Sequence, residues 1–437
     1  MRLLVVSEHY APTAHTEAFC TARFARALAA AGADVTVVTS GPGYVRETPQ
    51  DPSPTWADEG GVEVVRLPTP RPRPWKALRT AWTRCVRPRR MKWWHDDARR
   101  RALALHAARP FDVVVTRHEP DRVAWIGHAL ATTGVPWIAL FPDPSPPCLH
   151  PPPYGAAAPR DARERADLAA SQRWWDAASA FAWPCARLAR VHARALGREA
   201  APRIVVPHVG GVAAARVGDG GPAAEGTARP GARPSDGIVL VHTGLWMKGR
   251  VSDAALAALR AAAAHAAGKG VPFRVDLVGP PKPADEARVR AAGLASAVRF
   301  RGWMPQDDAL AALRDATAGL LLEAPMEEGV YLPSKFCDYA RSGKPVLAFS
   351  PAEGTVADAL GAGHPGLLGQ TEASATAALV AFVDRFAAGG DAGLASWRAP
   401  GPERYAPEVV AAGFLRDVAQ VLGARSPAAG GPRVGGG

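Results

Sequence analysis

The sequence is poor in the features that mark secreted, metal-stapled or membrane-spanning chains. Its 437 residues include only five cysteines, and no two of them stand in a Cys-x-x-Cys spacing. Their scatter and odd number argue against a disulfide framework and against a zinc site, and a reducing, cytoplasmic setting fits best. No charged leader with an apolar stretch precedes the first strand pattern, so we expect no signal peptide. No run approaches ~20 consecutive apolar residues, which argues against a membrane-spanning helix.

Two further motifs are missing. No Gly-x-Gly-x-x-Gly follows the first apolar run, Leu3–Val6, which argues against a nicotinamide-dependent oxidoreductase. No recognition motif for nucleic acid is present either, although the net charge is +11. A positive balance of this size also suits phosphorylated ligands or an anionic membrane. The position of the charges therefore matters more than their sum.

The basic residues gather in one stretch of the chain. Thirteen Lys or Arg side chains fall within residues 71–109, with Trp75, Trp82, Trp93 and Trp94 among them. This pattern predicts a surface that docks on anionic lipid, and a solvated helical face is the alternative. We expect a cytoplasmic protein that binds peripherally at the inner face of a membrane through this stretch and binds no nucleic acid.

Short apolar runs alternate with helical patterns along most of the chain. The strand Leu3–Val6, the helix Ala18–Ala31 and the strand Val35–Val38 form a βαβ unit, which requires a parallel sheet. Further strands are expected at 62–67, 111–116, 137–141, 178–183, 203–206, 238–241, 274–278, 298–300, 319–322 and 345–349. The predicted fold class is α/β, with two doubly wound Rossmann-like domains that face a central cleft.

Composition marks where one domain ends and the next begins. Residues 1–211 form the first predicted domain, and the Gly-, Pro- and Ala-rich residues 212–236 form a flexible linker. Residues 237–402 form the second domain, and residues 403–422 form a terminal helix expected to return to the first. The Gly-rich residues 423–437 are expected to be disordered.

The segment from Glu327 to Leu347 carries the most specific chemistry. Gly329 permits close approach of a ligand to the backbone. Pro333 and Ser334 begin a helix, with Ser334 expected at the N-cap, and the free amides of its first turn form an anion site. Lys335 lies in that turn, where a cation is unfavourable unless an anion is bound. Asp338, on the same face as Ser334, can accept hydrogen bonds from sugar hydroxyls.

The run Pro-Ser-Lys-Phe-Cys-Asp-Tyr-Ala-Arg-Ser-Gly-Lys-Pro-Val at 333–346 resembles the donor-site segment of the retaining GT-B enzymes of glycosyltransferase family 4. In that family, an acidic residue five positions before the glycine binds the nucleotide ribose, and Asp338 matches it here. An earlier acid contacts the donor sugar, and Glu328 is its best match, with Glu327 beside it. Nine residues separate Glu328 from Asp338, where the family has seven.

The resemblance extends to other segments of both domains. Thr243 and Gly244, followed by Lys248 and Arg250, resemble the first strand of the donor domain and its basic pair for the diphosphate. Residues 298–304, with Gly302 and Trp303, resemble the loop that holds the base. In the N-terminal half, residues 5–12 resemble the first strand and its loop, and residues 136–144 resemble a strand that ends beside the acceptor.

Three residues of the N-terminal half are candidates for contacts with the donor sugar or the acceptor. The loop around His15 replaces the Gly-Gly pair that the family often has, and we place His15 on the acceptor side. Asp143 is the expected acceptor-side carboxylate, and capping of a turn before Pro144 is the alternative. His118 is expected to contact donor sugar or acceptor, and a structural role is the alternative.

The resemblance implies a hexosyltransferase-like enzyme that moves a sugar from a nucleotide-sugar donor, with retention and without metal or other cofactor. The acceptor is a saccharide, a lipid-linked sugar or a small molecule, and polysaccharide biosynthesis is the expected role. The predicted catalytic residues are His118, Glu328 and Lys335. Simple surface or packing roles remain open for Lys335, Arg250 and Trp303. The alternative function is a GT-B-related sugar-nucleotide epimerase.

Overall fold

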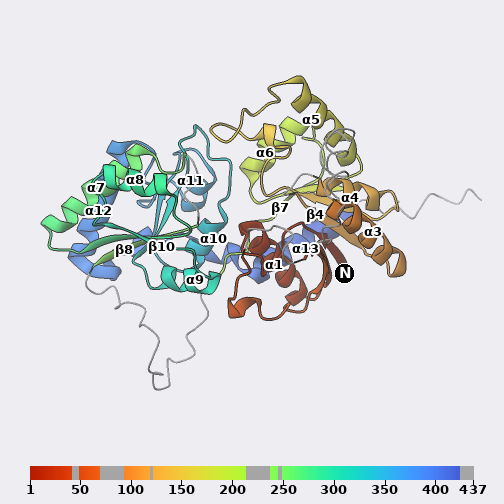
Figure 1. Cartoon of the computed structure of the whole chain (residues 1–437), viewed down its shortest axis with the longest axis horizontal. Helices are drawn as coiled ribbons and strands as arrows, with labels where there is room; N and C mark the ends of the chain where they lie inside the picture. The colour runs from red at the N-terminus through yellow and green to blue at the C-terminus, as the bar shows by residue number, and fades with distance from the viewer. Residues whose placement is uncertain (42–48, 69–92, 119–121, 213–236, 245–248, 424–437) are drawn as a thin grey trace, which may run out of the picture.

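The computed structural model describes residues 1–41, 49–68, 93–118, 122–212, 237–244 and 249–423 (Figure 1). In the N-terminal half, a parallel sheet has the strand order β3-β2-β1-β4-β5-β6-β7. Its elements are β1 (Arg2–Val6), α1 (Thr16–Ala30), β2 (Asp34–Ser40), β3 (Glu63–Leu67), α3 (Trp93–Ala108), β4 (Val113–Arg117), α4 (Val123–Ala131), β5 (Trp137–Leu140), α5 (Ala162–Trp175), β6 (Ala180–Trp183), α6 (Ala186–Leu196) and β7 (Arg203–Val205).

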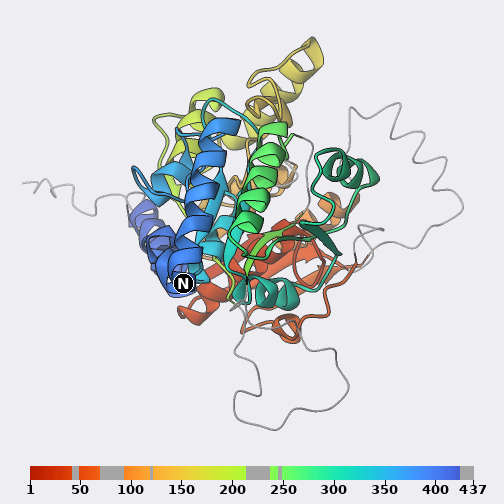
Figure 2. The ribbon, with the colours of Figure 1, turned by 90° about the vertical axis from the view of Figure 1, so that its left-hand side faces the viewer.

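The C-terminal half contains a second parallel sheet with the order β10-β9-β8-β11-β12. Its elements are β8 (Ile238–Thr243), α7 (Asp253–Gly268), β9 (Phe273–Val278), α8 (Pro283–Ala291), β10 (Val298–Gly302), α9 (Gln306–Arg314), β11 (Ala318–Leu322), α10 (Ser334–Arg341), β12 (Val346–Phe349), α11 (Thr355–Leu360), α12 (Glu372–Gly389) and α13 (Pro407–Gly423). Figure 2 shows α7 and α12 side by side over this sheet. The predicted α/β class with two parallel sheets is confirmed.

The central strands are buried on both faces, which explains their continuous apolar runs. In β1, Leu3 and Val5 pack with α1 and α13, whereas Leu4 and Val6 pack in a separate cluster that includes Trp94 of α3. This alternation is the period of two expected of a strand. Helices therefore cover both faces of the first sheet and leave only its strand ends open for a ligand.

The chain crosses between the two halves twice. After β7, residues 206–212 pass beside α10, where Arg341 Nη1 donates to the Gly210 carbonyl at 3.0 Å. After the second sheet, α13 returns to the first half and packs on α1, with the rings of Phe24 and Phe414 edge to face at 5.0 Å. Most of the predicted linker (213–236) and most of the predicted tail (424–437) lie outside the described residues.

The predicted lipid-docking stretch also lies partly outside the described residues, since residues 71–92 are not among them. Its last part forms α3, and the structure buries Trp94, Ala98 and Ala102 of this helix in the core. The inclusion of Trp94 in a membrane-facing surface is therefore wrong, because its ring packs inward. Of the described helices, none combines the length and apolar character needed to cross a bilayer.

Candidate active site

Lys335 lies in the first turn of α10 and turns toward the end of β8. The helix begins at Ser334 with Pro333 at the N-cap and no side-chain cap, so the expectation that Ser334 is the N-cap is wrong by one residue. Lys335 Nζ is 3.2 Å from His242 Nε2, and His242 Nδ1 is 3.0 Å from the Leu320 carbonyl. A carbonyl only accepts, so Nδ1 carries the proton and Nε2 accepts from the amine.

The surroundings of Lys335 disfavour its positive charge. Burial, together with the neighbouring Arg250 guanidinium, lowers the pKa of Lys335 to about 7, with Asp338 acting in the opposite direction. Gly244 has φ +103°, and a Cβ there would lie 3.1 Å from Lys335 Nζ. The backbone after β8 thus leaves room for the amine. An anion bound here would restore the charged form of Lys335.

Arg250 connects this group to the N-terminal half. Its Nε donates to the hydroxyl of Tyr154 at 3.1 Å, and Tyr154 stands edge to face with Tyr331 at 5.6 Å. Tyr331 in turn bonds His150 Nδ1 through its hydroxyl at 3.0 Å. The Pro-rich loop after β5 therefore reaches the donor-side loop of the other domain. Lys335 and Arg250 lie where the two domains meet, whereas Lys248 lies outside the described residues.

On the N-terminal side, two carboxyl groups have opposite electrostatic surroundings. Burial opposes ionisation of Glu17, but Arg117 and His208 outweigh it and lower the pKa of Glu17. Glu17 Oε2 lies 2.7 Å from Arg117 Nη2. Burial and then Glu17 raise the pKa of Asp143 to about 6, while Arg250 and Arg117 act against this rise. One acid is thus held ionised and the other titrates near neutrality.

His15 lies at the edge of this group. It caps α1 through its ring, since Nδ1 accepts from the Glu17 amide at 3.3 Å, and it stacks on His9 at 4.4 Å. Burial lowers the pKa of His15, which favours the neutral ring that this cap requires. His15 follows β1 and Asp143 follows β5, so both lie at the carboxyl ends of strands of the first sheet. Asp143 is also close enough to Arg250 of the second domain to feel its charge.

His118 does not join this group. Its ring is buried, stacks on Phe141 at 4.3 Å and lies 2.8 Å from Thr116 Oγ1. Successive side chains of a strand point to opposite sides, so Arg117 faces Glu17 while His118 enters the core. Contact of His118 with the donor sugar or the acceptor stays a prediction, and in this structure its ring packs in the core. Sequence reasoning missed Arg117, which the period of two along β4 places on the side of Glu17.

Glu327 and Glu328, in the loop before α10, do not lie beside the Lys335 amine. Glu328 pairs with Arg187 at 2.7 Å and with Arg190, both on α6. Glu327 is exposed, and Gly329 lies against the backbone of Gly354 rather than an open space. In this arrangement neither acid lies against Lys335. Their expected contact with a donor sugar stays a prediction.

Asp338 faces the N-terminal domain. Its Oδ1 accepts from Arg23 Nη1 at 2.7 Å and from the Gly211 amide at 2.6 Å. Thr243 donates its amide to the hydroxyl of Tyr339 at 2.9 Å, so the neighbouring residue of α10 fixes the end of β8. Sequence reasoning missed Arg23 because it lies 315 positions from its partner.

The predicted base-binding residues lie at the end of β10. Trp303 is 43% exposed and follows Gly302, whose φ is +73°. The Gly302 carbonyl accepts from the Gly279 amide at 2.8 Å, which ties this turn to the end of β9. An exposed indole beside a fixed turn is available for stacking.

A buried carboxyl that sequence reasoning missed lies at the end of β11. Glu323 accepts a hydrogen bond from the hydroxyl of Ser350 through Oε2. Burial raises the pKa of Glu323 to about 7, although Ser350 and Arg250 act in the opposite direction. The sequence signal that could have identified Glu323 is its position as a single acid directly after the apolar strand β11.

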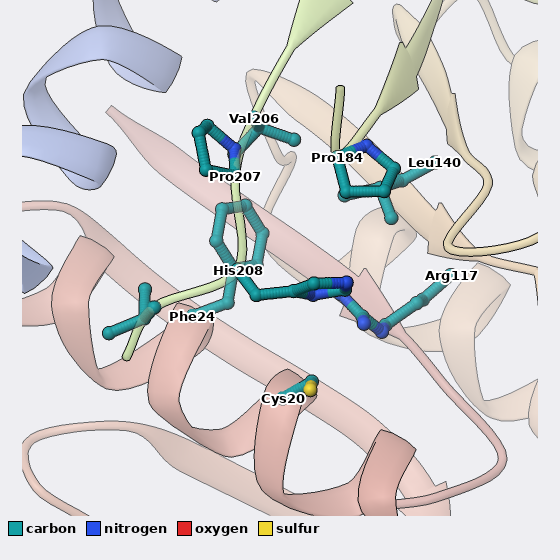
Figure 3. A pocket seen from close by; sticks show the side chains of 9 residues that line it. Cys20, Phe24, Arg117, Leu140, Pro184, Val206, Pro207 and His208 are labelled. Carbon is teal, nitrogen blue, oxygen red and sulfur yellow. The ribbon is translucent and has the colours of Figure 1, made fainter. Parts of the chain in front are cut away.

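A small cavity lies beneath the N-terminal part of the site (Figure 3). It has a volume of about 10 Å³, and Arg117 and His208 lie side by side over Cys20 in its lining. That volume is about the size of one water molecule and far below that of a sugar. A sugar therefore does not fit in this cavity. No cluster of three metal-ligating side chains occurs in the described part of the chain.

Comparison with known proteins identifies the arrangement. Residues 18–210 match the family model of the Glycosyl transferase 4-like domain. Sucrose-phosphate synthase from Thermosynechococcus elongatus is 17% identical with a TM-score of 0.62, covering 97% of this chain and 100% of that one. The Anabaena protein HepE, in complex with UDP-glucose, is 13% identical with a TM-score of 0.58, covering 96% and 100%. The α,α-trehalose 6-phosphate synthase from Burkholderia multivorans is 15% identical with a TM-score of 0.59, covering 99% of both.

No curated protein sequence matches the chain significantly. The identities to the solved structures are low, so these structures establish the fold alone. The two parallel sheets and the coverage of whole chains show the GT-B fold. Residues 18–210 are in addition similar to the Glycosyl transferase 4-like domain.

Proposed function

We propose that the cleft transfers a sugar from a nucleotide-sugar donor to a saccharide, lipid-linked or small-molecule acceptor, with retention of configuration and without a metal. The observation that carries the proposal is the pair of cations at the domain junction. The Arg250 guanidinium lies close enough to Lys335, at the start of α10, to disfavour the positive charge of the amine. A diphosphate is the ligand that relieves this repulsion, and helix amides add to its binding.

The chemistry follows from where charge develops. Breaking the bond between sugar and phosphate leaves positive charge on the sugar and an additional negative charge on the diphosphate. Lys335, Arg250 and the free amides of α10 stabilise the leaving group, and such preorganised groups typically contribute ~3–4 kcal/mol each to the transition state. In this proposal these cations take the place of a divalent ion. Retention follows from the resemblance to family 4.

The N-terminal side supplies the acceptor contacts in this proposal. Asp143 accepts a hydrogen bond from the acceptor hydroxyl, and the cation of Arg117 keeps Glu17 ionised beside it. His15 borders the same space as the cap of α1. The anomeric proton of the product reports retention, so nuclear magnetic resonance of the transferred sugar tests this step.

The test of the function begins with the donor. Nucleotide sugars, UDP-glucose included, are screened for a rise in melting temperature, since a ligand that binds only the folded state stabilises it. The stabilising donor is then incubated with saccharide and lipid-linked acceptors in the presence of EDTA. The proposal predicts a transferred sugar with its original anomeric configuration. An inverted product, or loss of turnover in EDTA, contradicts retention or metal independence respectively.

The same reaction mixture tests the epimerase alternative. An epimerase converts the nucleotide sugar into its isomer without any acceptor. Chromatography of the nucleotide fraction, with and without acceptor, therefore separates the two functions. Isomerised donor in the absence of acceptor would contradict the transferase.

The peripheral membrane role is part of the same proposal. It is supported by the thirteen basic side chains of residues 71–109, of which Arg100, Arg101 and Arg109 are exposed on or after α3. We expect the protein to sediment with vesicles of anionic lipid at low salt and to be released at high salt. Equal binding to neutral vesicles would contradict an electrostatic attachment.

A further inference from the structure

Arg23 of α1 reaches from the N-terminal domain to the helix that carries the donor-site motif. Figure 1 shows α1 and α13 next to α10 at the junction of the two domains. Arg23 Nη1 donates to Asp338 Oδ1 at 2.7 Å and lies 3.3 Å from the Val209 carbonyl. Its side chain is 11% exposed and that of Asp338 is 15% exposed. A pair this sheltered is screened far less than a surface ion pair.

The crossing segment between the domains is shaped around this pair. A Cβ on Gly211 would lie 2.2 Å from Arg23 Nη2, and a Cβ on Gly210 would lie 2.6 Å from the Cys337 carbonyl. Gly210 therefore has to be glycine for the segment to pass α10, whereas a side chain at position 211 would displace the Arg23 guanidinium. The Gly211 amide also donates to Asp338 Oδ1 at 2.6 Å. The backbone of the crossing and the guanidinium of Arg23 thus converge on one oxygen atom.

The Arg23 guanidinium and the Gly211 amide both donate to the same oxygen of Asp338, Oδ1. An aspartate has only two side-chain torsions, so fixing one oxygen fixes the other. Arg23 and Gly211 therefore determine where Oδ2 points.

We propose that Arg23 is a positioning residue of the donor site, which holds Asp338 so that its free oxygen accepts from the ribose hydroxyls of the bound nucleotide. This inference rests on the proposed function, because it takes Asp338 as the ribose contact. Arg23 itself touches neither substrate. Since Arg23 belongs to one domain and Asp338 to the other, recognition of the ribose depends on the domains being in their present arrangement.

The experiment measures ribose recognition directly. Calorimetry gives the dissociation constants of UDP, ADP and GDP, each against its 2′,3′-dideoxy form, for the full chain and its variants. We expect the best ribonucleotide to bind the natural protein about 10-fold or more tightly than its dideoxy form, as a hydrogen bond to a charged group contributes. In Arg23→Met this ratio falls toward one, and in Arg23→Lys part of it returns.

Two controls separate the inference from the function on which it rests. Arg341→Met removes a guanidinium that bonds the same crossing segment at Gly210 without touching Asp338, so the ratio should persist. Asp338→Asn should lose the ratio regardless of Arg23. Unchanged melting temperatures show that each variant is folded.

The outcomes are distinguishable. If Asp338→Asn loses the ratio while Arg23→Met keeps it, Arg23 does not position the carboxylate and the inference is wrong. If Asp338→Asn also keeps the ratio, the ribose contact itself is wrong. Failure of the natural protein to bind any of the three nucleotides would overturn the proposed function.

Discussion

At the scale of single residues, the site depends on the Lys335 amine, which lies between the acceptor nitrogen of His242 and the Arg250 guanidinium. Lys335 donates to a neutral His242 and has the Arg250 guanidinium beside it. An isolated lysine would keep its charge far above neutral pH. Here the charge is marginal at pH 7, so its stabilisation by a bound anion becomes measurable.

Donor binding should therefore take up a proton. The pKa of Lys335 is about 7 in the free protein, and a bound diphosphate raises it by favouring the ammonium form. Donor affinity is then full below pH 7 and falls as pH rises from 7 toward the pKa of the complex. Calorimetry at pH 8 in two buffers of different ionisation enthalpy should show this uptake, and Lys335→Met should abolish it. Equal heats in both buffers for the natural protein would contradict the linkage.

Asp143 predicts a different pH dependence. Its pKa of about 6 means that the acceptor-binding carboxylate forms as pH rises through 6, so turnover should rise with it. Asp143→Asn keeps an acceptor oxygen but cannot titrate, and we expect about a 100-fold lower turnover with no rise near pH 6. The measurement is kcat/KM for the acceptor between pH 5 and 8. If kcat/KM of Asp143→Asn still rises near pH 6, the rise is caused by a group other than Asp143.

Sequence reasoning located only part of this set of residues. Lys335 and Asp143 stand out because each directly follows a strong local signal, a helix start and the end of a strand. Arg117, Tyr154 and Arg23 carry no such signal, because their roles come from partners more than 90 positions away. Arg117 could have been found from strand periodicity, because it faces the opposite side of β4 from Thr116 and lies against Glu17.

At the scale of elements, α9 shows how the two domains share a helix terminus. This helix has no side-chain cap of its own. Its first amides instead donate to the other domain, Gln306 to Asp51 Oδ2 at 2.9 Å and Asp307 to Ser53 Oγ at 3.0 Å. Thr55 completes the contact by donating its hydroxyl to Asp307 Oδ1 at 2.6 Å. The cap therefore exists only while the domains are together.

Removing that cap should open the molecule. Asp51→Ala with Ser53→Ala removes two caps of ~1 kcal/mol each, which act only in the closed arrangement. Small-angle scattering should show a larger radius of gyration for the double variant. Ser252→Ala is the matched control, because Ser252 caps α7 within its own domain and accepts from Ala255 at 3.1 Å. Ser252→Ala should lower the stability without changing the radius of gyration. A radius of gyration for the double variant equal to that of the natural protein would contradict a role of this cap in holding the domains together.

The strands were predictable and several helices were not. The β-branched, buried strands such as β2 and β4 read as continuous apolar runs, so their positions were expected to within a few residues. In α5, α8 and α12, alanine and charged residues blur the apolar stripe that marks a helix. These helices are stabilised by packing on the folded sheets. A local sequence pattern carries no information about that packing.

At the scale of the whole molecule, contacts on different sides of the junction hold the domains together. Arg187 of α6 bonds Asp358 of α11 as well as Glu328, while Arg23 and the cap of α9 act elsewhere along the junction. Repeated alternation of strands and helices was sufficient to predict two parallel sheets. The mutual placement of the domains was not predictable, because it depends on ion pairs between residues far apart in the chain.

The central claim is that the Lys335 amine holds the donor diphosphate at this junction, and turnover of Lys335→Ala tests it most directly. The variant is compared with the natural protein at saturating acceptor, with the melting temperature of both measured in the absence of donor. We predict a loss of about 100-fold or more in turnover with the fold intact. Turnover equal to that of the natural protein would remove Lys335 from the mechanism and contradict the account.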